Sequence, residues 1–184
     1  RLLERGMFDF GDQTVQENLS FLLQRVIRKG SLELTRYMME VMNIEPRDKD
    51  VMKHAVTAGN VPMIDYLLAR GIKPFGMAIA AINHDTNTIQ KLIDHGIDLE
   101  GEDALRALEI AVVDGDLGMT EFLLHAGINP NLTNESLLFI PITKNNIEMV
   151  QLLIDYHNEF VNEDTSAFVV AAKSGFKEMI ELLL

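Results

Sequence analysis

Apolar residues recur along the chain in a fixed order after a small turn residue. Counting from Gly59, two leucines follow at eight and nine positions and Gly71 follows at twelve. The same count from Gly115 leads to two leucines and then to Gly127. Six residues, here called the anchors, begin such a count and stand 29, 25, 31, 30 and 30 residues apart: Gly30, Gly59, His84, Gly115, Asn145 and Gly175. The chain therefore contains an internal repeat of about thirty residues.

Each anchor lies between two predicted helices. Small residues such as Ala80-Ala81 precede it, and they allow close approach of a first helix to its neighbours. Apolar residues at i, i+3 and i+4 follow it, as in Met63-Ile64 with Leu67-Leu68, and they predict a second helix. Glycine, asparagine or histidine supplies the left-handed residue that closes such a helical hairpin. We expect caps on the second helices at Ser31, Asn60, Asp116 and Asn146, and glycines that end them at Gly71, Gly96 and Gly127.

This pattern resembles the ankyrin repeat, most closely in residues 58–71 and 114–131. The resemblance covers essentially the whole chain. It implies an all-α helical-repeat solenoid of about six helix pairs with short or degenerate hairpin loops. We expect one array over residues 1–184, with the tail of a preceding repeat at 1–8 and repeats at 14–45, 46–73, 74–99, 100–130, 131–161 and 162–184, the last incomplete. Because the chain starts and stops inside second helices, we expect it to be a fragment of a longer protein.

Two features depart from the ankyrin pattern. The Thr-Pro-Leu-His start of the first helix is nearly absent, for example in Asp50-Val51-Met52-Lys53. Residues 72–74 are too few for the projecting β-hairpin of the family, so we expect the hairpin to be missing there. For the other connections, plain loops and true hairpins both stay open. A helical solenoid of another repeat class is the structural alternative, but its units would be longer.

The repeat also predicts which side chains form the core. In a linear array each repeat buries its apolar face on its neighbours. The predicted apolar seam consists of Leu34, Ile64, Leu67, Leu68, Ile89, Leu92, Phe122, Leu123, Val150, Leu153, Ile180 and Leu183.

Composition excludes several classes of function. The 184 residues contain no cysteine, so disulfides and thiolate metal sites are excluded. The net charge of −12 argues against nucleic-acid binding, which depends on clustered Lys and Arg. No apolar run is long enough to cross a bilayer. We therefore expect a soluble intracellular protein, cytoplasmic or nuclear, that does not bind membranes.

The sequence predicts no catalytic residue, metal site or cofactor. His95, His125 and His157 recur at the ends of second helices, but equivalent positions in successive repeats are separated by about 8–10 Å, too far to share one zinc. A histidine near a helix C-terminus is favourable to the helix dipole, and this is the preferred interpretation. No phosphate-binding loop or nucleophile elbow is present. We therefore predict that the chain is not an enzyme.

The preferred function is a protein–protein interaction module that binds a partner protein or peptide. The alternative is a substrate-recognition array of a larger enzyme or receptor whose catalytic domain lies outside these residues. A purely structural spacer is a third candidate. The oligomeric state is not predicted.

The resemblance places the binding surface on the concave face, formed by the first helices. The two residues before each anchor lie near the end of a first helix and are mostly polar. The candidate binding residues among them are Arg28, Lys29, Thr57, Asn83, Asp114, Thr143, Lys144, Lys173 and Ser174. An ordinary solvated face would have the same composition.

The connections between repeats carry most of the net negative charge. The connection at 97–103 contains Asp98, Glu100, Glu102 and Asp103, which we predict to belong to an acidic rim. Such a rim would steer a basic peptide or protein surface and speed association. The alternative is that these acids are ordinary caps near helix starts.

Overall fold

The computed structural model describes residues 13–46, 50–133, 137–156 and 165–184. All regular structure in these ranges is helical, and they contain no strand. No helix within them is long and apolar enough to span a membrane. The chain divides into two compact units, with the boundary between Gly76 and Met77. Each unit is described by itself, and the single array over 1–184 stays a prediction.

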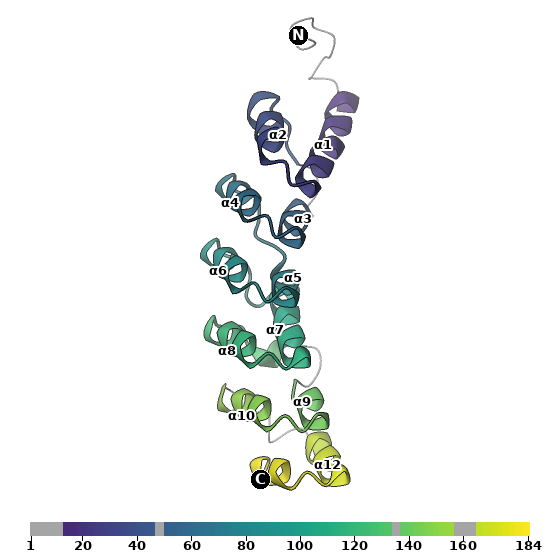
Figure 1. Cartoon of the computed structure of the whole chain (residues 1–184), viewed down its shortest axis with the longest axis vertical. Coiled ribbons are helices and arrows are strands. Elements are labelled where there is room, and N and C mark those ends of the chain that lie inside the picture. The colour runs from purple at the N-terminus through teal and green to yellow at the C-terminus, as the bar shows by residue number, and fades with distance from the viewer. Residues whose placement is uncertain (1–12, 47–49, 134–136, 157–164) are drawn as a thin grey trace, which may run out of the picture. The chain divides into compact units, whose positions relative to one another are not determined.

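In the part of unit 1 that the structure describes, the helices form two pairs. The first helices are α1 (Gln13–Arg28) and α3 (Val51–Thr57), and the second helices are α2 (Leu32–Arg36) and α4 (Val61–Ala69). The helix α2 continues directly as a π-helix, η2 (Tyr37–Val41). Within this unit α1 packs on α2 and α3, and α3 packs on α4. Neighbouring pairs thus contact each other through their first helices (Figure 1).

The described residues of unit 2 form four helix pairs. Its first helices are α5 (Met77–Ile82), α7 (Glu102–Asp114), α9 (Phe139–Thr143) and α12 (Thr165–Ser174). Its second helices are α6 (Thr86–Asp94), α8 (Leu117–His125), α10 (Ile147–Tyr156) and α13 (Lys177–Leu182). A 3-10 turn, η3 (Pro130–Leu132), follows α8. The first helices of this unit pack on one another in succession, and so do α8, α10 and α13. The predicted all-helical repeat fold is confirmed.

All six anchors adopt the left-handed conformation that the sequence predicts. The four anchor glycines have φ between 59° and 77°, and His84 and Asn145 have φ of 53° and 54°. A side chain with a Cβ is disfavoured there, but asparagine and histidine are enriched among the exceptions. The anchor therefore closes each pair even where glycine is absent. The predicted helix-ending glycines Gly71, Gly96 and Gly127 also have positive φ.

The predicted apolar seam is correct at most positions. Nine of its side chains are buried: Ile64, Leu67, Leu68, Ile89, Leu92, Leu123, Val150, Leu153 and Leu183. Phe122 and Ile180 are half-buried. The prediction is wrong for Leu34, which is 45% exposed. Leu34 lies in the first described pair of unit 1, which has a described neighbour on one side only, and α2 buries Thr35 instead.

The residue after the anchor caps its own second helix. Asn60 Oδ1 accepts a hydrogen bond from the Met63 backbone N–H at 3.1 Å, and Asn146 Oδ1 accepts one from Met149 at 3.0 Å. Asp116 makes the same contact with Met119. Three of the four predicted caps are therefore confirmed. The prediction is wrong for Ser31, whose side chain makes no cap hydrogen bond.

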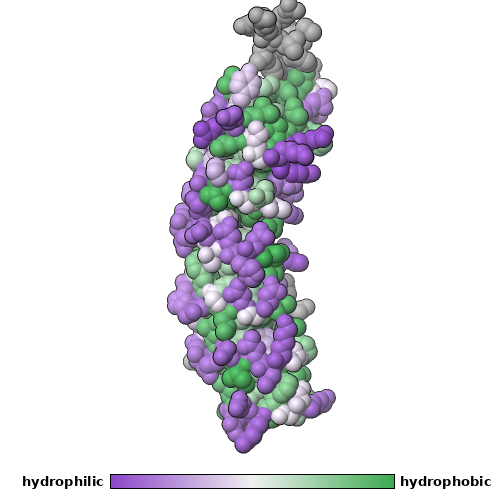
Figure 2. Space-filling model, in the orientation of Figure 1, coloured by the Kyte–Doolittle hydropathy of each residue, from purple (hydrophilic) through white to green (hydrophobic). Residues whose placement is uncertain are grey.

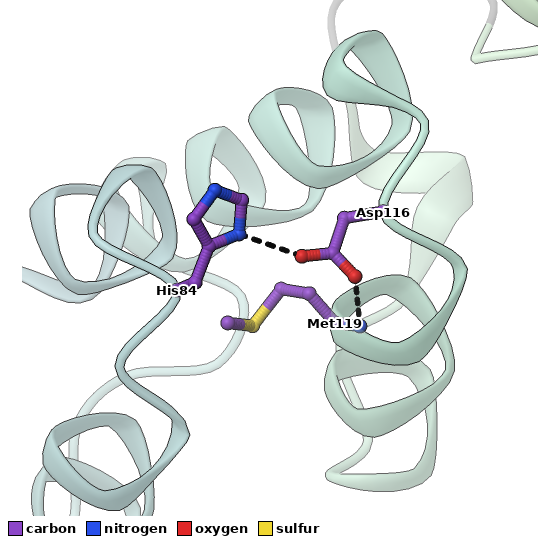
Figure 3. Close-up of polar contacts among 3 residues, drawn as sticks. All are labelled: His84, Asp116 and Met119. Atoms are coloured by element: carbon purple, nitrogen blue, oxygen red, sulfur yellow. Dashed lines mark hydrogen bonds and ion pairs between the residues drawn. The ribbon is translucent and has the colours of Figure 1, made fainter.

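The same residue can also reach back to the preceding helix pair. Asn60 Nδ2 donates to the carbonyl oxygen of Gly30 at 3.1 Å. Asp116 Oδ2 accepts from His84 Nδ1 at 2.7 Å, while its other oxygen caps α8 (Figure 3). One side chain thus orders a turn and fixes the spacing between two pairs.

Candidate partner-binding face

One face of each first helix is left uncovered by the packing. Positions nine, six, five and two before the anchor lie on the same side of a helix, because they follow i, i+3, i+4, i+7 spacing. In α7 the intervening positions Ala107-Leu108 and Ala111-Val112 are buried, whereas Val113 is 45% exposed. We call the surface formed by these four positions the first-helix face; among its described members Ala78 of α5 is buried, and the others are exposed or half-buried.

In unit 2 the first-helix face is largely apolar. Four of its side chains are exposed large hydrophobics: Ile82 (55%), Val113 (45%), Phe139 (45%) and Val169 (43%). Four more, one from each first helix, are half-buried: Ile79, Ile110, Ile140 and Val170. We call these eight residues the apolar stripe. Side chains of this kind on successive helices of one unit are typical of a surface that another molecule covers.

In unit 1 the same face is polar and basic. It includes Arg25 and Arg28 from α1 and Lys53 from α3, and Lys29 adjoins it; one acid, Asp50 at the start of α3, also lies on it. The four cationic residues, which we call the basic patch, are all exposed. Strongly hydrophilic residues are visible over the lower end of α1 in Figure 2.

The two helices of the basic patch are joined by one polar contact. Arg28 Nη2 lies 3.2 Å from His54 Nε2. Since a guanidinium can only donate, Nε2 must accept, which leaves the hydrogen of the neutral ring on Nδ1. The contact therefore orients Arg28 without neutralising its charge.

The nine predicted residues at the ends of the first helices are all exposed. Three of them make hydrogen bonds to the protein backbone. Thr57 Oγ1 donates to the Lys53 carbonyl at 2.7 Å, and Thr143 Oγ1 donates to that of Ile140 at 2.8 Å. Lys144 Nζ donates to the Val113 carbonyl of the preceding pair at 2.6 Å.

Sequence reasoning missed the apolar stripe, because it considered only the two residues before each anchor. The helical spacing of the uncovered positions could have revealed Ile79, Ile110 and Phe139.

The four predicted acidic residues differ in exposure and in the contacts that they make. Asp98, Glu100 and Glu102 are exposed in one connection, where Asp98 Oδ1 accepts from the Glu100 backbone N–H at 3.1 Å. Asp103 is half-buried instead, and its two oxygens accept from the backbone N–H groups of Met77 at 2.8 Å and Ala78 at 3.3 Å. Asp103 therefore caps α5 of the preceding pair.

An open hollow lies beside these acids. It has a volume of about 300 Å³ and is lined by Glu102, Leu105, Arg106, Glu109 and Leu132. Its wall combines two carboxylates with one guanidinium, that of Arg106, and with two apolar side chains.

The described histidines at the ends of second helices make local contacts. His95 and His125 each donate from Nδ1 to the carbonyl four residues earlier, at 2.8 and 2.9 Å. The Tyr156 hydroxyl lies 2.8 Å from His125 Nε2, which is free to accept. The third predicted histidine, His157, lies outside the described residues. No group of three or more His, Asp or Glu side chains that could hold a metal ion is found in the part searched, the described residues.

Two comparisons with known proteins bear on these surfaces. Residues 110–184 match the family model for ankyrin repeats, in three copies. Over 115 residues the chain is 29% identical to the mitochondrial liver isoform of glutaminase from Rattus norvegicus. That match covers 59% of this chain and 19% of the relative, so the chain spans only a small part of that protein's length.

Proposed function

Because the chain carries ankyrin repeats, which serve as protein-interaction modules, we propose that it binds a partner protein or peptide on its first-helix face. The observation that carries the proposal is the apolar stripe of unit 2. Ile82, Val113 and Phe139 expose about half of their surface to water on three successive first helices. Covering such side chains is favourable by roughly 25 cal/mol per Å² of apolar area, and apolar anchors of this kind dominate many interfaces.

The test compares capture of a partner by two matched variants. The chain is immobilised and exposed to an extract of its source, and captured proteins are identified by mass spectrometry. The variant Ile82→Ser/Val113→Ser should lose a partner that the wild type retains. The control Gln90→Ala/Glu121→Ala alters exposed positions on the second helices of the same two pairs and should retain it. Equal capture by both variants would contradict the proposal.

The acidic connection of unit 2 supports a finer proposal about the partner. Asp98, Glu100 and Glu102 are exposed on this connection, so their charges face solvent. We propose that these side chains form an acidic rim that attracts a basic segment of the partner. Its main effect would be on the association rate, because long-range attraction between charges steers diffusional encounter.

The rim is tested by the salt dependence of the association rate with the captured partner. Neutralising Asp98, Glu100 and Glu102 should flatten the fall in rate between low and high salt. A matched control neutralises Glu121, Glu148 and Glu178, which are exposed on second helices of the same unit. Asp103 is left unchanged because it caps α5. A rate that does not depend on salt would show that the rim has no steering role.

The similarity to a glutaminase favours a second candidate function. The match is confined to 19% of that relative, so the chain would correspond to a recognition array attached to a catalytic domain elsewhere. In this case the full-length protein from the source should release ammonia from glutamine, and residues 1–184 alone should not. A full-length protein without this activity would remove the candidate.

A further inference from the structure

The first helices of unit 1 carry an unusual local charge. Residues 20–30 and 51–60 contain Arg25, Arg28, Lys29 and Lys53 but no aspartate or glutamate, although the whole chain has a net charge of −12. The nearest acids along the chain, Glu17 and Asp50, lie at or near the starts of α1 and α3. A quarter of the 16 Lys and Arg residues is therefore concentrated on one exposed surface.

Arg36 in α2 and Arg70 directly after α4 have partners. The Arg36 guanidinium lies over the Tyr66 ring at 5.3 Å, and Arg70 lies 3.6 Å from a carboxylate oxygen of Glu45. Within the described residues, by contrast, no ion pair involves any member of the basic patch. Arg28 donates to His54 Nε2, a contact that supplies no negative charge to the guanidinium. The patch is thus organised but not neutralised.

We propose that the basic patch docks an acidic peptide segment of a partner protein, whose carboxylates pair with Arg25 and Arg28. This inference rests on the proposed use of the first-helix face and specifies the chemistry of what binds in unit 1. A planar guanidinium forms two parallel hydrogen bonds with a carboxylate, which gives both strength and geometric selection. Phe21, 62% exposed one turn before Arg25, offers a contact for an apolar side chain of the same peptide.

Charge considerations favour a peptide over a nucleic acid. Only four cationic side chains are available, and the remainder of the chain is strongly negative. Affinity for a polyphosphate backbone increases with the number of neutralised phosphates, so a long polyanion would gain little here and would be repelled elsewhere. A short segment with a few carboxylates matches the extent of the patch.

Fluorescence anisotropy with labelled octapeptides tests the proposal on the intact chain. The probe is Glu-Ser-Glu-Leu-Glu-Ser-Glu-Ser, and the reference peptide has glutamine at each glutamate. We expect the acidic probe to bind at least about tenfold more tightly at low salt, the effect of one good charge-assisted contact. The variant Arg25→Gln/Arg28→Gln should remove this difference. The control Arg36→Gln/Arg70→Gln removes the same charge from α2 and from the residue directly after α4, and it should preserve the difference.

Several outcomes would overturn the proposal. These are equal binding of the two peptides, equal losses in the two arginine variants, and preferential binding of a phosphoserine octapeptide or a single-stranded DNA octamer. Partner capture that depends on Ile82 and Val113, without any preference for the acidic probe, would also overturn it while leaving the proposed function intact. A preference for the probe that depends on Arg25 and Arg28 supports it even if no partner is captured.

His54 provides an independent test, as a positioning residue for Arg28. The variant His54→Ala removes the acceptor of the guanidinium and should weaken probe binding by about threefold, less than loss of the charge itself. The variant His54→Gln restores an acceptor oxygen and should recover most of the affinity. Equal binding by His54→Ala and the wild type would contradict this arrangement.

Discussion

Two links at the same repeat position, one in each unit, join successive helix pairs with different chemistry. In unit 1 the side chain of Asn60 caps α4 and donates to the Gly30 carbonyl. In unit 2 the side chain of Asp116 caps α8 and accepts from His84. The first link is neutral and uses the backbone carbonyl of the anchor as its acceptor. The side chain of the anchor therefore plays no part in it, and any residue that tolerates positive φ can occupy the anchor position. The second link depends on the identity and ionisation of two side chains.

The difference is visible in how Asp116 titrates. The backbone N–H of Met119 donates to its carboxylate, and this contact, together with the neighbouring His84, holds the pKa of Asp116 below its ordinary value. Partial burial acts in the opposite direction without cancelling these contacts. Asn60 has no corresponding titration. The residue after the anchor can therefore link two helix pairs by hydrogen bonds that do not depend on pH, as Asn60 does, or by an ionisable carboxylate, as Asp116 does.

The largest expected effect concerns the core, where the units should not differ. Leu67 and Leu123 occupy the same repeat position, one in each unit, and both are fully buried. Replacing either by alanine should lower the free energy of unfolding by about 2–5 kcal/mol, through lost transfer energy and a residual cavity. Leu34→Ala, at an exposed site, should cost less than about 0.5 kcal/mol. Urea denaturation checks all three variants, and a large loss in Leu34→Ala would contradict the exposed position of that side chain.

Exchanging the two link residues should have an intermediate and unequal effect. Asn60→Asp places a carboxylate oxygen where Nδ2 now donates to Gly30, so repulsion replaces a hydrogen bond. We expect a loss of about 1–2 kcal/mol at neutral pH. Asp116→Asn keeps an oxygen that can cap α8 and should cost about half as much. Thermal unfolding of both variants measures the asymmetry, and equal losses would show that the two links are chemically equivalent.

A smaller effect is expected from two buried threonines at one repeat position. Thr35 Oγ1 donates to the Ser31 carbonyl at 2.8 Å. Thr120 Oγ1 is buried and has no hydrogen-bond partner among the described residues. Thr120→Val should therefore raise the free energy of unfolding by up to about 1 kcal/mol, whereas Thr35→Val should lower it by about 0.5 kcal/mol. Equal changes of the same sign in urea denaturation would contradict this difference.

The smallest effect is the dependence of stability on acid. Because folding lowers the pKa of Asp116, the ionised carboxylate stabilises the fold at every pH above its ordinary pKa of about 4. That contribution is lost as the pH falls through the lowered value. The wild type should therefore lose stability more steeply between neutral pH and pH about 3 than Asp116→Asn, which does not titrate there. Identical slopes in acid titrations followed by circular dichroism would contradict the effect.

The sequence predicted the helix pairs because their determinants are local. A left-handed residue at each anchor, an apolar i, i+3, i+4 pattern after it and a cap at the next position act within a few residues of each other. Asn60 and Asp116 therefore behave as predicted. Ser31 and Leu34 do not, since both lie in the pair where α2 passes into a π-helix and where only one described neighbour is present.

The exposure of individual side chains was less predictable, because it depends on which positions the neighbouring helices cover. The polar ends of the first helices were correctly predicted to be exposed, but the exposure of Phe139 and Val169 follows from packing between pairs. Asp103 shows the same limit. Its sequence position suggests a cap for its own helix α7, but its carboxylate serves α5, 25 and 26 residues earlier.

That cap also imposes an order on folding during synthesis. The N-terminal N–H groups of α5 belong to Met77 and Ala78, and the carboxylate that satisfies them belongs to a residue translated later. A chain emerging from the ribosome can close the turn at His84 as soon as α5 and α6 are exposed. Helix α5 then lacks its side-chain cap, and its first N–H groups bond to water, until residue 103 has left the exit tunnel. Its native N-terminus is therefore completed only after the first residues of the next pair have been translated.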